Sequence, residues 1–162
     1  MKTIPSFTID HIRLLRGIYV SRKDQVGGDT VTTFDIRMKE PNREPAFGPG
    51  SICTPSNTWP PPSCVTILYG GDKIVYWGPM GCLTGNYLLM KGDLESKDIV
   101  ELMQETFRFV AEFEGEVPGT TPKDCGNCLL HDLPMAKWES ARYLHEVLEK
   151  MTDKNLYYPQ KA

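Results

Sequence analysis

Residues 96–115 read SKDIVELMQETFRFVAEFEG, and this stretch decides the fold class because its apolar residues follow the period of a helix. Ser96 stands where an N-cap is expected, and Gly115 ends the run. The residues at helical spacing are Ile99, Met103, Phe107 and Val110. The pattern predicts one amphipathic helix.

A second helix is predicted to begin near Pro134, because proline is favoured in the first turn of a helix. Apolar residues stack on one side of it, as in an amphipathic helix: Met135, Trp138, Ala141, Leu144 or His145, Leu148 and Met151.

The chain before residue 91 has strand character instead, with Gly27 and Gly28 marking a hairpin turn. The predicted strands are Ser6 to His11, Gly17 to Ser21, Asp29 to Met38, Lys73 to Trp77 and Asn86 to Met90. Strands followed by helices predict an α+β sandwich with an antiparallel sheet.

Residues 47–71, FGPGSICTPSNTWPPPSCVTILYGG, differ from their surroundings, with five prolines, no charged residue and neither a strand nor a helix period. An ordinary proline-rich surface loop is the alternative interpretation. We expect residues 53–66 to be irregular, within one domain that spans residues 1–162.

Composition and charge narrow the class of protein. The chain has 162 residues, 40% hydrophobic and 24% charged, which suits a single globular domain. Its net charge of -3 offers no basic field for nucleic acid or anionic lipid. Charged residues from Asp10 to Arg16 interrupt any signal-peptide core, so we expect a cytoplasmic protein with no membrane partner.

Five cysteines, an odd number, indicate thiol chemistry or metal binding in a reducing compartment before they indicate disulfides. Cys82 lies in the turn GPMGCLTG, whose glycines can expose the sulfur, although a buried inert thiol is the alternative. Cys125 and Cys128 form a C-x-x-C pair, which could chelate a metal or carry redox chemistry.

Six segments taken together resemble the S-ribosylhomocysteine lyase (S-ribosylhomocysteinase, LuxS) family, in particular its clostridial-type members. They are SFTIDH at 6–11, TTFDIRMKEPN at 32–42, GPMGC at 78–82, LESKDIVELMQETF at 94–107, PKDCGN at 122–127 and LPMAK at 133–137. The resemblance covers the chain except for about residues 47–71 and the last few.

The resemblance implies a fold and a chemistry. The fold is a LuxS/metallopeptidase-like α+β sandwich, assembled as a homodimer with active sites at the subunit interface. Fe2+, replaceable by Zn2+ or Co2+, is held by a His-x-x-Glu-His helix and one cysteine, and acts as a Lewis acid while side-chain bases move protons. The ribose of S-ribosylhomocysteine is isomerised, and β-elimination then releases homocysteine and 4,5-dihydroxy-2,3-pentanedione, the autoinducer-2 precursor used in quorum sensing.

Residue roles follow from the same resemblance. It implies that Cys82 is the catalytic base and Cys125 the third metal ligand. It implies that Ser6, His11 and Arg37 line the substrate pocket. Cys128 and His131 lie outside the family pattern and are interpreted as structural, although either could be a substitute ligand.

The chain departs from the family where its two metal-binding histidines are expected, near Cys53 and Asn57, because neither position holds histidine. If the codons of this segment are read from the third base of each, they permit HTIEHLAATFLRNHPVW, which restores the missing helix. We therefore hypothesise two compensating frameshifts, in the gene or in its recorded sequence. Without those ligands, metal should bind weakly or not at all.

Position 83 is a second departure, because Leu83 replaces a family arginine and Cys82 lacks that neighbouring cation. Phe is likewise expected where Asn86 stands. The leading hypothesis is a metal-dependent carbon–sulfur lyase. Its rivals are a catalytically dead remnant that only dimerises or binds substrate weakly, and a redox or structural-zinc module built on Cys125 and Cys128.

Overall fold

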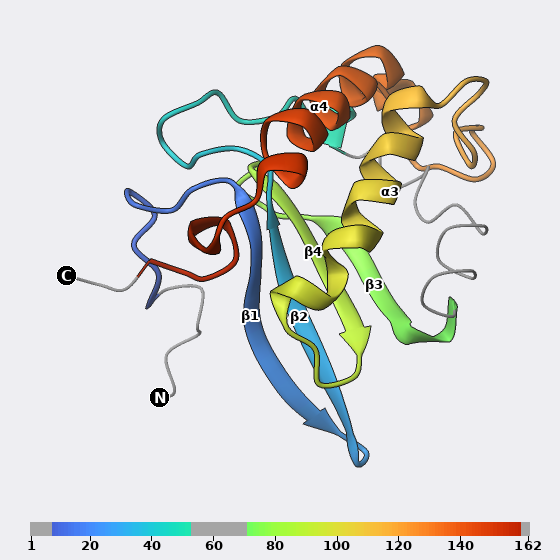
Figure 1. Ribbon diagram of the computed structural model, residues 1–162. Helices are drawn as coiled ribbons and strands as arrows, with labels where there is room; N and C mark the ends of the chain where they lie inside the picture. The colour runs from blue at the N-terminus through green and yellow to red at the C-terminus, as the bar shows by residue number, and fades with distance from the viewer. Residues whose placement is uncertain (1–7, 53–70, 160–162) are drawn as a thin grey trace.

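The computed structural model describes residues 8–52 and 71–159. Four strands form one sheet, and two α-helices pack on one side of it (Figure 1). The strands are β1 Gly17–Val26, β2 Asp29–Arg37, β3 Ile74–Pro79 and β4 Gly85–Lys91. The helices are α3 Val100–Glu112 and α4 Leu133–Glu146, with short 3-10 turns at Gly71–Lys73, Ser96–Ile99, Cys128–Leu130, Leu148–Lys150 and Asp153–Asn155.

Every strand pair in the sheet is antiparallel, in the order β1-β2-β4-β3. Gly27 and Gly28 connect β1 to β2 with φ of 58° and 92°, the conformation that a tight hairpin turn requires and that glycine adopts at little cost. The predicted α+β class, with strands before helices, is confirmed. β1 continues five residues beyond the predicted Ser21 and carries a bulge between Val20 and Arg22.

The N-terminal strand predicted at Ser6 to His11 is wrong in the part that can be described. Residues 8–13 contain no strand, residues 11–13 form a turn, and the Asp10 carboxylate accepts a hydrogen bond from the backbone N–H of Ile12 at 3.0 Å. An aspartate that binds the backbone two residues ahead favours a turn over an extended strand.

Both predicted helices form, and the expected start near Pro134 is confirmed. Ser96 is not the N-cap: it begins the 3-10 turn Ser96–Ile99 that leads into α3, and Glu95 caps that turn by exchanging capping-box hydrogen bonds with Asp98. α4 begins behind Asp132, whose carboxylate accepts the backbone N–H of Met135 at 3.0 Å. Within the described residues, no helix is long and apolar enough to cross a membrane.

The hydrophobic core lies between one face of the sheet and the two helices (Figure 1). Alternate strand residues point to the same face, which places Ile18, Phe34, Ile36, Leu88 and Met90 together. Helix residues that close this core are Ile99, Leu102, Met103, Phe107, Tyr143 and Leu144.

The apolar side expected for α4 is buried only towards its C-terminal end, where Leu144 and, after the helix, Leu148 lie in the core. Met135 and Trp138 are 44% and 56% exposed, whereas Glu139 and Ser140 are buried. Glu139 accepts a hydrogen bond from the Lys39 ammonium at 2.5 Å, so a charge pair replaces apolar contact on this helix face. The 3-10 turn Leu148–Lys150 after α4 also changes the phase of the later residues.

The proline-rich segment is only partly described. Residues 49–52 are helical, a short start that the sequence pattern did not predict, and Ile52 is buried in the core. The irregular structure expected for residues 53–66 lies outside the described residues.

Candidate functional site

The sheet face opposite the helices carries a row of polar and aromatic side chains. Tyr19, Asp35 and Tyr87 lie directly opposite one another on β1, β2 and β4. Two residues further along β2, Arg37 is flanked in register by Gly17 and Gly85. Backbone packs closely at both glycines, because an added Cβ would lie 2.2 Å from the carbonyl oxygen of Asn155 at Gly17 and 2.2 Å from that of Ile36 at Gly85. Asp35 and Arg37 are 1% and 3% exposed. Two charged side chains are therefore buried within this face.

Asp35 and Arg37 form a two-pronged ion pair. Arg37 donates from Nη2 to Asp35 Oδ2 at 2.6 Å and from Nε to Oδ1 at 3.1 Å. Paired hydrogen bonds of this kind fix the plane of the guanidinium as well as its distance. Burial opposes the charge on Arg37, but the Asp35 carboxylate outweighs that effect, and the pKa of Arg37 is raised.

Cys82 lies at the free end of this guanidinium. Arg37 Nη1 donates to Thr84 Oγ1 at 2.5 Å and lies 3.7 Å from Cys82 Sγ. Thr84 Oγ1 is itself 3.0 Å from the sulfur. Because the Thr84 oxygen already accepts from Arg37, its own hydrogen is available to the sulfur. A deprotonated Cys82 would thus receive two donors, one of them cationic.

The turn that presents Cys82 is strained but well anchored. Cys82 is exposed, and Leu83 after it has a φ of 55°, a left-handed conformation that costs a branched side chain about 1–2 kcal/mol. Backbone bonds from Leu83 N–H to Met80 O (2.9 Å) and from Phe47 N–H to Leu83 O (2.9 Å) hold it. The Leu83 side chain packs against the core, so the cation beside Cys82 comes from Arg37 and not from position 83.

The other predicted site residues are dispersed. His11 lies in the turn before β1, with Nδ1 3.1 Å from the carbonyl oxygen of Ile9. Among the residues described, it makes no hydrogen bond with Cys82 or Arg37. Ser6 lies outside the described residues, as do positions 53 and 57 and the proposed frameshift.

Cys125 lies in the loop before α4, beside a histidine. Its Sγ is 3.5 Å from His131 Nε2 and accepts the backbone N–H of Asn127 at 3.4 Å. Tetrahedral zinc, with bonds of about 2.3 Å to sulfur and about 2.0–2.1 Å to nitrogen, holds such atoms about 3.5 Å apart. His131 therefore has the spacing of a second ligand to the same ion.

Two donors do not complete a metal site. Across residues 8–52 and 71–159, no group of three or more His, Cys, Asp or Glu side chains could hold a metal ion. A structural zinc site has four ligands and a catalytic one has three from the protein. The described residues alone therefore do not fit the metal that the family resemblance implies.

Asp35, Thr84 and Tyr158 also belong to the site, although no motif predicted them. Asp35 stands two residues before Arg37 on a strand, a spacing that places both side chains on one face and could have identified it. Thr84 stands two residues after Cys82. Tyr158 donates to Asp35 Oδ2 at 2.9 Å from the far end of the chain, and no local pattern signals that contact.

Comparison with known proteins places the chain in a family. The family model described as S-Ribosylhomocysteinase (LuxS) matches residues 4–154. S-ribosylhomocysteine lyase of Phocaeicola vulgatus is 78% identical over 165 residues, covering 99% of each chain. The enzyme of that name from Porphyromonas gingivalis is 65% identical, covering 98% of this chain and 99% of its own.

A clostridial relative is less similar than the sequence motifs suggested. S-ribosylhomocysteine lyase of Clostridium beijerinckii is 48% identical over 163 residues, covering 98% of this chain and 99% of its own. Each match extends over nearly the full length of this chain and of its relative. The family model spans the sheet, the Cys82 turn and both helices. The chain therefore belongs to the S-ribosylhomocysteinase (LuxS) family.

Proposed function

We propose that this protein is a carbon–sulfur lyase that cleaves S-ribosylhomocysteine to homocysteine and 4,5-dihydroxy-2,3-pentanedione, the autoinducer-2 precursor. Relatives with that activity in their names match nearly its whole length. The observation that carries the proposal is the exposed Cys82 thiol, with Thr84 Oγ1 at 3.0 Å and the Arg37 guanidinium at 3.7 Å. This arrangement suits a base that must hold and release a proton.

Cys82 is assigned the role of base in the elimination. Its thiolate takes the proton from the carbon next to the substrate carbonyl, and that electron pair forms a carbon–carbon double bond. The carbon–sulfur bond breaks at the same time, and the departing sulfur takes up a proton to become homocysteine. Ser6, His11 and Arg37 are assigned to substrate binding, and Arg37 Nη1, 3.7 Å from Cys82 Sγ, is also placed to stabilise negative charge that develops on that sulfur during the reaction.

We also propose that Cys125 is a ligand of the divalent metal, Fe2+ with Zn2+ or Co2+ as substitutes, with His131 beside it. The support is their 3.5 Å separation and the suitability of thiolate and imidazole for these ions. The remaining donors would come from residues outside the described part of the chain.

A homodimer is proposed as the working form, in the cytoplasm. Val75 and Tyr76 on the edge strand β3 are 57% and 51% exposed, and association would remove such apolar surface from water. A catalytic thiol also requires a reducing compartment, in which Cys82 does not become trapped as a disulfide.

The test is release of homocysteine from S-ribosylhomocysteine, measured chromatographically with chain loaded anaerobically with Fe2+ or Co2+. Cys82→Ser should reduce the rate about a hundredfold or more, since a general base contributes about 10²–10⁴-fold. Cys128→Ser is the matched control, because it makes the same chemical change at a cysteine that both test chains retain. A second chain carries HTIEHLAATFLRNHPVW in place of residues 53–69.

The two chains separate the two parts of the proposal. Activity in the restored chain alone would support the function and locate the missing donors in the replaced segment. A restored chain that is folded and metal-loaded but releases no homocysteine would overturn the assigned function.

A further inference from the structure

The carboxyl-terminal end of the chain reaches the ion pair beside Cys82. Tyr158 OH donates to Asp35 Oδ2 at 2.9 Å, the same oxygen that accepts Arg37 Nη2 at 2.6 Å. A continuous path of polar contacts therefore runs from Tyr158 through Asp35 and Arg37 to Cys82 and Thr84.

Tyr158 is held in place independently of that path. Its ring stacks on Tyr19 with centroids 4.7 Å apart and planes at 11°. Tyr19 is fully buried, and its hydroxyl donates to the carbonyl of Leu15 at 3.0 Å and lies 3.3 Å from that of Lys154. Asn155 Nδ2 donates to the carbonyl of Arg16 at 2.8 Å, which ties the preceding turn to β1. These contacts fix where the Tyr158 hydroxyl can point.

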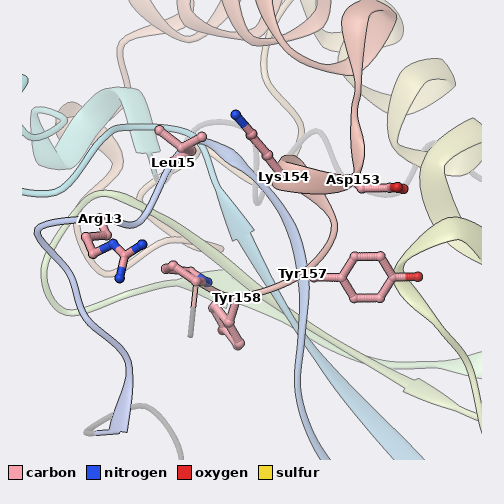
Figure 2. A pocket seen from close by; sticks show the side chains of 7 residues that line it. Arg13, Leu15, Asp153, Lys154, Tyr157 and Tyr158 are labelled. Carbon is pink, nitrogen blue, oxygen red and sulfur yellow. The ribbon is translucent and has the colours of Figure 1, made fainter. Parts of the chain in front are cut away.

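The other side of Tyr158 is open. It lies in the wall of a pocket of about 510 Å³, with Arg13, Leu15 and Lys154 around it (Figure 2). The tyrosine thus separates this pocket from the buried pair, and only its hydroxyl enters the polar path.

We propose that Tyr158 is a positioning residue for the candidate catalytic thiol, acting through Asp35 and Arg37. The inference rests on the proposed role of Cys82. Asp35 receives three hydrogen bonds, two from Arg37 and one from Tyr158, which leave its carboxylate little freedom to rotate. A fixed carboxylate fixes the guanidinium plane, and that plane decides whether Nη1 points at Cys82.

The protonation of Tyr158 agrees with a donor role. Burial, and then the negative charge of Asp35, raise the pKa of Tyr158 far above its ordinary value. The phenol therefore keeps its proton at neutral pH and can donate a hydrogen bond to Asp35.

Tyr158→Phe tests the proposal, because it keeps the ring and its stacking on Tyr19 but removes the hydroxyl. Tyr157→Phe is the matched control: the same atom is lost from the neighbouring tyrosine, which is 56% exposed and has no contact with Asp35 among the described residues. The first readout is the rate of iodoacetamide labelling at Cys82 at pH 7, with the labelled peptide identified by mass spectrometry. It needs neither metal nor substrate.

The expected result is labelling of Cys82 about threefold to tenfold slower in Tyr158→Phe, with Tyr157→Phe unchanged, because one of three donors to the carboxylate is lost. In active chain, kcat should fall by a similar factor while KM changes less than twofold. Equal labelling rates in all three proteins, with circular dichroism showing the same fold, would overturn the proposal.

A double-mutant cycle separates action through Asp35 from a general loosening of the structure. Asp35→Asn alone should slow labelling more than Tyr158→Phe, and adding Tyr158→Phe to it should have little further effect. Additive effects would mean that Tyr158 does not act through Asp35. Failure of homocysteine release in every chain would count against the proposed function, whereas the labelling rates would still decide the role of Tyr158.

Discussion

Breaking the buried pair between Lys39 and Glu139 should unfold the protein at much lower denaturant concentration. The pair joins the segment after β2 to α4, with Nζ 2.5 Å from Oε1 and side chains only 5% and 11% exposed. Lys39 also lies over the rings of Phe47 at 4.8 Å and Trp138 at 5.9 Å, so its ammonium is surrounded by aromatic carbon instead of water.

The two single substitutions should differ in cost. At an effective dielectric of about 20, the attraction at 2.5 Å is about 7 kcal/mol before desolvation is subtracted. Lys39→Met leaves Glu139 a second cation, Arg142 at 3.9 Å, whose attraction is about 4 kcal/mol on the same scale. Glu139→Leu leaves the Lys39 ammonium without a carboxylate. We expect losses of about 2–3 kcal/mol for Lys39→Met and about 3–5 kcal/mol for Glu139→Leu.

The double variant decides whether charge is the cause. Lys39→Met with Glu139→Leu places two apolar side chains in contact, and its free energy of unfolding should lie within about 1 kcal/mol of the wild type. Urea denaturation followed by circular dichroism gives all four values. As a control, Lys91→Met breaks the exposed pair with Asp29, 2.9 Å apart, and should leave the urea midpoint almost unchanged. A double variant that loses the sum of both single losses would refute this reasoning.

Three further perturbations have definite expected outcomes. Burial raises the pKa of Glu44, but the backbone N–H of Glu40 and then Arg142 and Arg16 lower it below its ordinary value. The ionised Glu44 carboxylate therefore stabilises the folded protein above about pH 4.5, and this contribution disappears as the pH falls through the lowered pKa. Glu44→Gln should therefore cost about 1 kcal/mol at pH 7 and progressively less in acid, measured by urea denaturation. Asn86→Leu should stabilise by about 1–2 kcal/mol and raise the thermal midpoint, because Asn86 is fully buried and its Oδ1 has no hydrogen-bond partner among the described residues. Cobalt titration followed by absorbance should show a cobalt–thiolate band. Cys125→Ser should abolish this band, and His131→Ala should lower the affinity for cobalt about tenfold or more.

Each of these has an outcome that contradicts it. A Glu44→Gln deficit that does not shrink as the pH is lowered would mean that packing, not charge, is lost. A lower midpoint for Asn86→Leu would reveal a partner for the amide oxygen. His145→Ala is the control for cobalt, because His145 is exposed on α4 beside Glu149, and equal cobalt affinity in both histidine variants would exclude His131 as a ligand.

The sheet and both helices could be predicted from the sequence because local pattern determines them. Alternation along β2 and the glycine pair at its start are enough to define a hairpin, and Pro134 marks the start of α4. The buried side of the first half of α4 could not be predicted, because hydrophobicity ranks Trp138 as core and Glu139 as surface. Glu139 is buried instead, because Lys39, a hundred residues away in the sequence, pairs with its carboxylate inside the protein.

The candidate site, too, has residues that the sequence predicted and contacts that it could not predict. The glycine-flanked turn at Cys82 and the family resemblance identified the thiol and Arg37 separately, but their 3.7 Å contact depends on the register between β2 and β4. The contact of Tyr158 with Asp35 could not be predicted at all, because 123 residues separate the two in the sequence. Contacts of that kind follow from the fold and not from any local motif.

The buried Asp35–Arg37 pair is better explained by the geometry it imposes than by stability. Taking two charges out of water costs several kcal/mol per ion, and apolar side chains of similar volume often replace such pairs without loss of stability. β2 alternates this pair with Phe34 and Ile36, so an all-apolar strand would suit two buried faces equally well. An apolar pair, however, could not direct an N–H toward Thr84 and Cys82 while its other N–H groups are occupied. The ion pair therefore presents one oriented cation beside an exposed thiol, an arrangement that suits the base that we propose Cys82 to be.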